Sequence, residues 1–283
     1  MQSVDNSGVG AATPGTLRDK KSRPRITVSQ ILGEILLTLG ALALLFAFYE
    51  SFWTNIESGR QQNEANQLLE ESWSAPEGER VNPRQALNPE LGEAFARMYI
   101  PTFGSDFHFA VIEGTTESEL IAGPGRYTDS QMSGQPGNFA LAGHRVGKGA
   151  PFNDLDNLNS CDAIVMETAT SWDVYRVMPL SGDAVTRHGE AADCFTEQQM
   201  ERMVTGEYAT VQGRYITTPN HVEVINPVPG FVETEVREGA ESLITLTTCH
   251  PQFSAAERMI VHGMLVESIT KIDGERPAAL EES

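Results

Sequence analysis

One uninterrupted apolar run, residues 31–49, constrains this chain more than any other feature, and within it Glu34 and Thr38 are the polar exceptions. About 20 such residues, at a helical rise of about 1.5 Å per residue, cover a hydrocarbon layer roughly 30 Å thick. Residues 18–25 include five basic side chains and one acidic one. Because basic flanks stay on the cytoplasmic side, the sequence predicts a single-pass cell-membrane helix over residues 28–53, with a cytoplasmic N-terminus and an extracellular C-terminal part.

Two other interpretations of the apolar run are a cleaved signal peptide and a buried core helix. The apolar region of a signal peptide is usually about 7 to 15 residues long and precedes a cleavage site of small residues. The run here is longer and ends in bulky aromatic residues, namely Phe48, Tyr49, Phe52 and Trp53. The basic flank before the run and the polar sequence after it argue against a core helix, so we prefer the membrane helix.

The composition of the remaining sequence indicates four further parts. Residues 1–27 are basic and rich in Ser, Gly, Thr and Pro, which predicts a disordered cytoplasmic tail. Residues 54–93 are polar with little apolar periodicity, so we expect an extracytoplasmic stalk, helical over residues 57–73. Residues 94–272 form the folded domain, and residues 273–283 form a polar C-terminal tail.

The membrane helix also divides the net charge, which is −19 for the whole chain. Residues 1–25 hold 5 basic and 2 acidic residues, a net +3, which leaves 15 basic and 37 acidic residues, a net −22, for the rest. Because affinity for nucleic acid comes mainly from Lys and Arg that displace counterions, we expect no nucleic-acid partner. None of the 3 cysteines belongs to a CxxC or paired Cys/His spacing, so the sequence predicts no zinc site.

Short extended segments recur through the folded domain, separated by Gly, Pro, Asn and Asp. Several alternate apolar and polar positions, as strands with one face in a core do, and this pattern predicts an all-β sandwich or barrel with short helices. One helix is expected over residues 196–204, where Thr196 can cap the N-terminus and Gln199 occupies the third helical position. The expected strands are residues 94–100, 107–113, 138–142, 163–168, 172–178, 243–248 and 259–269.

Cys249 is the main candidate for chemistry because it lies at the end of an apolar strand segment, directly before His250 and Pro251. The thiolate is the nucleophilic form of cysteine, so such a residue needs a base or positive charge nearby. His144 follows another expected strand, and Arg258 lies nine residues beyond Cys249, where a hairpin would return it to the cysteine. The residues alone leave open that Cys249 is a structural thiol.

The motifs around these three residues resemble those of the sortase family. They are TLTTC ending at Cys249, ERMIV containing Arg258 and AGHR containing His144, and they occur together with the N-terminal membrane helix. The resemblance covers residues 99–269. Within the family, the GPGRY, GN and APF segments and the HP after the cysteine look most like class E, the housekeeping type of high-GC actinobacteria.

The resemblance implies an eight-stranded sortase-type β-barrel and a cysteine transpeptidase. Cys249 would attack the Thr carbonyl of a C-terminal LAxTG or LPxTG sorting signal, cleave it between Thr and Gly, and form a thioester acyl-enzyme. His144 would protonate the departing amine and later deprotonate the incoming one. Arg258 would donate to the substrate carbonyl or its oxyanion. No metal or organic cofactor is implied.

The resemblance also implies two partners outside the membrane. One is a surface protein that bears a sorting signal, and the other is the amine of a lipid-linked peptidoglycan precursor of a Gram-positive cell wall. Tethering by residues 28–53 would keep the enzyme close to both and raise the effective concentration.

Several other residues have weaker assignments. Tyr127 would line the sorting-signal groove, since class E enzymes are associated with a Tyr in this region and with LAxTG, although an ordinary packed Tyr fits too. Thr247 and Thr248 would help to place the nucleophile or the substrate, but β-branched residues are also common in strands. His250 faces away from the nucleophile and His262 lies inside a strand, so both are expected to be structural.

Cys161 and Cys194 remain once the nucleophile is set aside. Outside the membrane they could form a disulfide that closes a loop of 33 residues around the expected strand pair at residues 163–178. Two buried thiols are the alternative, and the sequence does not decide between them.

Two alternative functions stay open. A sortase specialised for pilin polymerisation would use a pilin Lys as acceptor and often has a second, C-terminal membrane span, which residues 270–283 are too short and polar to provide. From a different class, the chain could be an anchored, non-catalytic surface module whose barrel binds a ligand.

Overall fold

The computed structural model describes residues 27–74, 88–272 and 274–282. The expected disordered tail therefore lies outside the described residues, apart from Thr27. The chain divides into two compact units, residues 1–47 and 48–283, which we describe separately. Helix α1 (Val28–Ser74) begins in the first unit with a stretch, Val28–Tyr49, that is long and apolar enough to cross a membrane.

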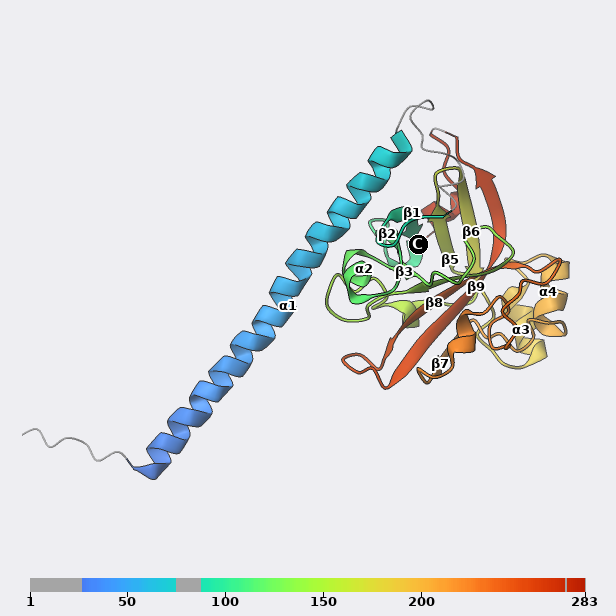
Figure 1. Ribbon diagram of the computed structural model, residues 1–283. Coiled ribbons are helices and arrows are strands. Elements are labelled where there is room, and N and C mark those ends of the chain that lie inside the picture. The colour runs from blue at the N-terminus through green and yellow to red at the C-terminus, as the bar shows by residue number, and fades with distance from the viewer. Residues whose placement is uncertain (1–26, 75–87, 273, 283) are drawn as a thin grey trace, which may run out of the picture. The chain divides into compact units, whose positions relative to one another are not determined.

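Eight strands of the second unit close into a β-barrel (Figure 1), as the family resemblance implies. The hydrogen-bonded order is β6, β5, β1, β2, β3, β4, β8 and β9, and β9 pairs with β6 to close the ring. A short additional strand, β7, pairs with β9 outside the ring. The strands are β1 (Ala94–Tyr99), β2 (His108–Glu113), β3 (Gly125–Arg126), β4 (Gly137–Ala142), β5 (Ala163–Glu167), β6 (Ser171–Val177), β7 (Arg214–Thr217), β8 (Ser242–His250) and β9 (Glu257–Thr270).

Strand β9 can close the barrel because it is 14 residues long and has different neighbours along one edge. On that edge its residues 258–261 pair with β7 and its residues 263–270 pair with β6. On the other edge, residues 257–264 pair with β8 along the whole of their common length. The start of β9 is therefore fixed between β7 and the end of β8.

Apolar side chains from alternate strand positions fill the barrel. Ile244 and Leu246 of β8 are fully buried there with Leu141 of β4 and Val261 of β9. The intervening residues of these strands therefore face outward. A second apolar cluster packs helices α3 (Ala184–Ala191) and α4 (Glu197–Val204) against the outer side of the wall, where it includes Leu243 and Met264.

The seven expected strands correspond to seven strands of the barrel unit, with ends that differ by two residues at most. The expected helix is α4, and Thr196 and Gln199 form its capping box. Two strands were not predicted, because β3 has two residues and β7 has four, too few for a periodic signal. Helices α2 (Glu117–Ala122) and α3 were also missed.

The C-terminal part of α1 belongs to the barrel unit and packs on its wall. Ala65 and Leu69 are 8% and 1% exposed, and they contact Ala110 and Ile112 of β2. The segment expected to be a stalk thus contains a docked helix that ends at Ser74. The part of that segment at residues 75–87 lies outside the described residues.

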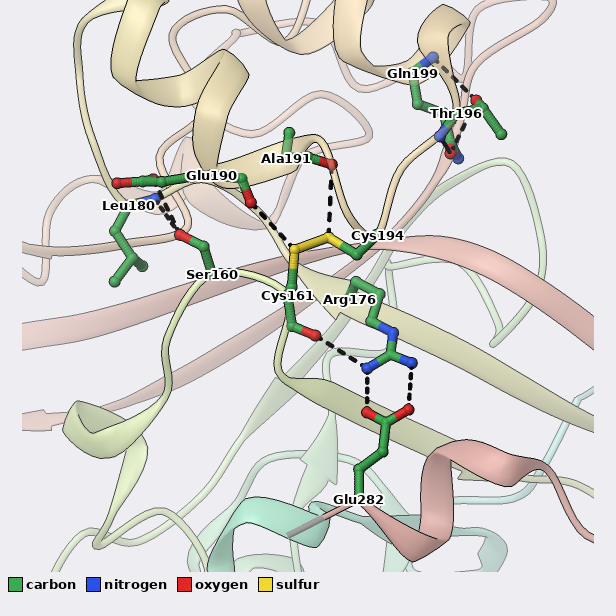
Figure 2. The surroundings of a disulfide bond; sticks show 10 residues. All are labelled: Ser160, Cys161, Arg176, Leu180, Glu190, Ala191, Cys194, Thr196, Gln199 and Glu282. Carbon is green, nitrogen blue, oxygen red and sulfur yellow. Dashed lines mark hydrogen bonds and ion pairs between the residues drawn. A yellow bond between two sulfur atoms is a disulfide. The ribbon is translucent and has the colours of Figure 1, made fainter.

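A disulfide joins Cys161, before β5, to Cys194, after α3, with their Cα atoms 5.7 Å apart (Figure 2). Of the two arrangements that the sequence left open, the structure has the bonded one. Arg176 of β6 donates to the carbonyl oxygen of Cys161 (3.0 Å) and pairs with Glu282, Nη2 lying 2.7 Å from Oε1. The disulfide and this ion pair fasten α3 and the C-terminal segment to the barrel wall.

His262 is fully buried in β9. Its Nδ1 lies 2.8 Å from the Thr245 hydroxyl, and that hydroxyl donates to Asn138 Oδ1 (2.8 Å), so Nδ1 carries the proton. Among the described residues, no group hydrogen-bonds Nε2. Burial lowers the pKa of His262 to about 3, so the imidazole is neutral in the folded protein. A buried, neutral histidine whose Nδ1 is hydrogen-bonded inside the barrel wall fits a structural role.

Replacing both Cys161 and Cys194 by serine should lower the free energy of unfolding by about 2 to 4 kcal/mol, because the unfolded chain gains freedom when the loop opens. Urea unfolding of the full chain in detergent measures the loss. Cys249→Ser is the matched control, since the thiol of Cys249 is unpaired. Equal stability of the wild type and the double variant would contradict the expected contribution.

Stability should fall below about pH 6.5 in part because of His262. An unfolded histidine binds a proton near pH 6.5, whereas His262 with its pKa of about 3 does not, so acid favours the unfolded chain. From pH 7 to pH 5 this contribution is about 2 kcal/mol. Over that interval His262→Gln should lose less stability in urea unfolding than the wild type does, while His188→Gln, at an exposed position of α3, should match the wild type. Equal losses in all three proteins would assign the pH dependence to other groups.

Candidate active site

Cys249, His144 and Arg258 lie at the same end of three neighbouring strands. Cys249 of β8 is the ladder partner of Arg258 at the start of β9. Strand β4 runs parallel to β8, and its last residue, Ala142, pairs with Thr247, two positions before Cys249. His144 follows two positions after Ala142, which places its backbone level with Cys249. The sheet register therefore brings together the three residues that the sequence proposed.

The side chain of Cys249 is on the outer face of the barrel wall. Ile244 and Leu246 occupy the interior, so Thr245, Thr247 and Cys249 alternate outward. Thr247 is 4% exposed, whereas Cys249 is partly exposed and is the free cysteine. The nucleophile candidate is thus accessible from outside while the ladder holds its backbone.

The imidazole of His144 is partly buried and has few polar contacts. Burial lowers the pKa of His144 below its ordinary value. Oε2 of Glu117, on α2, lies 3.8 Å from Nε2, too far for a hydrogen bond, and no described residue hydrogen-bonds Nε2. The other carboxylate oxygen of Glu117 pairs with the Lys148 ammonium. A neutral imidazole with an unengaged nitrogen is suited to transfer a proton.

The two threonines before the nucleophile fasten β8 to β4. Thr247 Oγ1 donates to the carbonyl oxygen of Leu141 (3.2 Å), and because a hydroxyl has one proton, Tyr127 must be the donor in its 3.0 Å bond to Thr247. Thr248 Oγ1 donates to the carbonyl oxygen of Gly143 (2.8 Å), directly before the histidine. Both hydroxyls therefore fix the offset between the nucleophile and the histidine loop, and the Thr247 hydroxyl also holds Tyr127 beside the nucleophile strand.

The guanidinium of Arg258 contacts the turn between β8 and β9. Its Nη1 donates to the carbonyl oxygens of Ala255 (3.1 Å) and Glu257 (3.0 Å). Among the described residues these are its acceptors, so Nε and Nη2 keep N–H groups that can donate to an oxygen bound near Cys249. The side chain is partly exposed. Its place opposite the nucleophile suits the stabilisation of negative charge on a substrate carbonyl.

His250 and Arg145, the sequence neighbours of two candidate residues, contact each other. Nη1 of Arg145 donates to Nδ1 of His250 (2.7 Å), and Nη2 donates to Asp156 Oδ2 (2.9 Å). Arg145 is 4% exposed. Sequence reasoning placed His250 on the face away from the nucleophile but did not single out Arg145, although the AGHR motif contains it. Glu117 and Lys148 were missed too, and no local pattern marks them.

Comparisons with known proteins match these features. A sequence model of the sortase domain matches residues 98–266. Sortase SrtE1 of Streptomyces coelicolor is 30% identical over 93% of this chain and 64% of its own length, and Sortase SrtE2 of the same organism is 29% identical over 94% and 92%. The solved SrtF sortase from Corynebacterium diphtheriae is 62% identical, with a TM-score of 0.70 over 72% of this chain and 100% of that one. The two Streptomyces relatives agree with the class E resemblance, and the chain belongs to the sortase family of cysteine transpeptidases.

Proposed function

We propose that this chain is a membrane-anchored transpeptidase that cleaves an LAxTG or LPxTG sorting signal between Thr and Gly. It then transfers the protein to the amine of a lipid-linked peptidoglycan precursor. The observation that carries the proposal is the meeting of Cys249, His144 and Arg258 at the aligned ends of β4, β8 and β9.

In the first half of the reaction, neutral His144 takes the proton of the Cys249 thiol, and the resulting thiolate attacks the carbonyl carbon of the signal Thr. The oxyanion of the tetrahedral intermediate accepts hydrogen bonds from Arg258, and one such preorganised donor is worth about 2.7 to 4 kcal/mol. The intermediate then collapses to a thioester as the bond between Thr carbon and Gly nitrogen breaks. His144 gives its proton to the Gly amine, which leaves as the free C-terminal fragment.

In the second half, the precursor amine attacks the thioester carbonyl. His144, now neutral, takes a proton from the amine, and Arg258 stabilises the second oxyanion. The second tetrahedral intermediate then collapses: the new amide forms, the bond between carbon and the Cys249 sulfur breaks, and Cys249 is left as a thiolate beside a protonated His144. In the free enzyme the Cys249 thiol and the His144 imidazole hold one proton between them; it leaves with the Gly amine, and the incoming amine restores it.

Tyr127 and the two threonines would act on the substrate side of this reaction. We assign Tyr127 to the wall of the sorting-signal groove because its hydroxyl donates to Thr247, two residues from the nucleophile. Thr247 and Thr248 would set the position of the nucleophile strand through their bonds to β4.

Membrane anchoring fits this chemistry. The apolar part of α1, Val28–Tyr49, supports a single membrane span, and the basic residues at 18–25 support a cytoplasmic N-terminus with the catalytic domain outside. Surface proteins and lipid-linked precursors are both present at that side of the membrane. A tethered enzyme meets them at a higher effective concentration than a free one does.

The full chain in detergent should cleave fluorogenic LAxTG and LPxTG peptides, and Cys249→Ala should abolish cleavage because the thioester cannot form. The assay is run with no acceptor, with a stem-peptide amine and with a pilin-type Lys peptide. Mass spectrometry of the products identifies the acceptor, and a preference for the Lys peptide would favour pilin polymerisation. If the wild type cleaves neither peptide, or if Cys249→Ala cleaves as well as the wild type, the enzyme proposal is wrong and a binding module becomes the better account.

Arg258→Ala should lower kcat by about 10²- to 10³-fold, as expected for the loss of an oxyanion donor. His144→Ala should lower it by about 10²- to 10⁴-fold through the loss of proton transfer. Circular dichroism checks that both variants are folded. Arg237→Ala is the matched control, because Arg237 is an exposed arginine paired with Glu233. Near-normal kcat in either active-site variant would assign its role to another residue.

A further inference from the structure

The loop after His144 makes a turn in an unfavourable backbone conformation. Four consecutive residues, 147–150, have positive φ, and two of them, Lys148 (φ 52°) and Ala150 (φ 40°), are not glycine. Side chains with a Cβ disfavour this left-handed region, so such residues persist where neighbouring groups hold them. The turn starts three residues after His144, so whatever holds it also bears on the proposed acid/base.

Helix α1 supplies groups that hold the turn. Gln62 Nε2 donates to the carbonyl oxygen of Lys148 (3.3 Å), and the Gly149 N–H donates to Asn55 Oδ1 (3.4 Å). The Gln62 side chain lies so close to the Gly149 backbone that no Cβ would fit there. A Cβ added at Gly149 would lie 2.2 Å from Gln62 Nε2. The backbone of the strained turn therefore rests directly on the helix, across about 90 residues of sequence.

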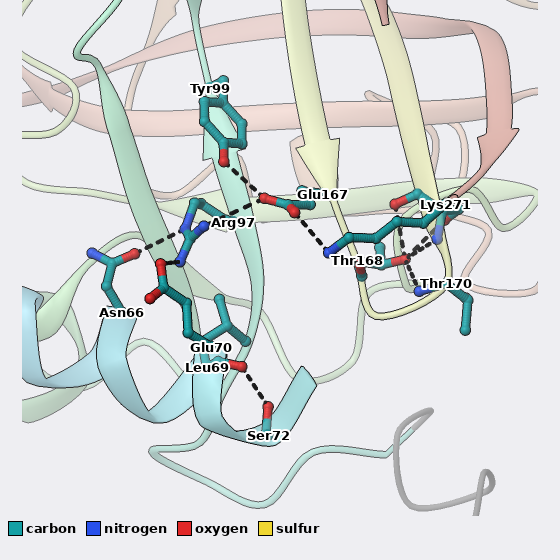
Figure 3. Close-up of polar contacts among 11 residues, drawn as sticks. Asn66, Leu69, Glu70, Ser72, Arg97, Tyr99, Glu167, Thr168, Thr170 and Lys271 are labelled. Carbon is teal, nitrogen blue, oxygen red and sulfur yellow. Dashed lines mark hydrogen bonds and ion pairs between the residues drawn. The ribbon is translucent and has the colours of Figure 1, made fainter. Parts of the chain in front are cut away.

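The helix is itself fixed to the barrel near its C-terminal end (Figure 3). Arg97 of β1 donates through Nε to Asn66 Oδ1 (3.0 Å) and pairs through Nη2 with Glu70 (2.9 Å). Lys271 lies 3.8 Å above the ring of Trp73 and pairs with the buried Glu167 (2.7 Å). These contacts add to the apolar contact of the helix with β2. Because α1 is held in place against the barrel, it can hold the turn in place in the same way.

The turn is connected to the catalytic histidine by two routes. The Lys148 ammonium pairs with Glu117, whose second oxygen lies 3.8 Å from His144 Nε2. The second route runs through the backbone. The Phe152 N–H, just after the turn, donates to the carbonyl oxygen of His144 (3.0 Å). A shift of the turn would move both Glu117 and the backbone that carries the imidazole.

We propose that Asn55 and Gln62 of α1 are positioning residues for the transpeptidase reaction. They hold the turn at residues 147–150 and thereby keep the imidazole of His144 in register with Cys249. The inference rests on the proposed function. It makes the segment between the membrane span and the barrel a part of the active-site support, in addition to a tether.

The test compares two double variants of the full chain in detergent. Asn55→Ala with Gln62→Ala removes both contacts, and Asn63→Ala with Gln67→Ala removes the same residue types from exposed positions of the same helix. We expect the first variant to lose roughly tenfold in kcat for the sorting-signal peptide with KM within about twofold, since a misplaced acid/base slows chemistry more than binding. The second variant should match the wild type.

Single substitutions sharpen the comparison. Asn55→Asp keeps an acceptor for the Gly149 N–H and should retain most of kcat. Gln62→Glu replaces the donor to the Lys148 carbonyl by a carboxylate oxygen, which cannot donate, so this variant should lose kcat. Hydrogen–deuterium exchange gives a readout that does not need activity. The amides of Gly149, Ala150 and Phe152 should exchange faster in the Asn55→Ala/Gln62→Ala variant alone.

Unchanged kcat together with unchanged exchange in that variant would overturn the inference while leaving the proposed function intact. Equal losses in both double variants would also overturn it, because the effect would then belong to the helix in general. If the wild type fails to cleave the peptides, the proposed function fails, and the exchange data still decide whether α1 holds the turn.

Discussion

The pairing of β8 with β4 on one side and β9 on the other is the constraint on which the site depends. Its register is set by the core, because Ile244 and Leu246 must face the interior for the barrel to be filled. A slip of one residue would turn these side chains outward and bury Cys249 instead. Apolar packing therefore decides which face of β8 carries the nucleophile, and the two ladders then decide what stands beside it.

Polar contacts between β8 and its neighbours make this register specific. The Thr247 and Thr248 hydroxyls each donate to a carbonyl oxygen of the β4 segment, one on either side of Ala142. Further down the same strands, Thr245 joins Asn138 to His262 in a fully buried network. Buried hydroxyls and amides are costly without partners, so an offset of β8 against β4 would leave them unsatisfied. Thus hydrogen bonds in the middle and near the C-terminal end of β8 reinforce the alignment that apolar packing selects.

The fold could be predicted where a pattern is local and long enough to repeat. The longer strands alternate apolar and polar residues, and the capping box of Thr196 and Gln199 spans four residues, so both could be predicted from the sequence. β3 and β7 were not, because they exist through pairing with neighbours and their own sequence is too short to show a period. The catalytic candidates were identified from sequence motifs. That the strands form a closed barrel, which β9 completes by pairing with β6, was implied by the family resemblance and not by the spacing of the strand segments.

The support of the site was beyond sequence reasoning for a different physical reason. Asn55, Gln62 and Lys148 are ordinary polar residues whose importance depends on tertiary packing that brings α1 to the turn after β4. Their contribution is also geometric. The carboxylate of Glu117 would favour a protonated His144, but Lys148 neutralises it at close range, and burial is what lowers the pKa of the imidazole. The Glu117–Lys148 pair therefore offers His144 a fixed neighbour with little net charge, so removing the helix contacts should change the position of the imidazole more than its charge state.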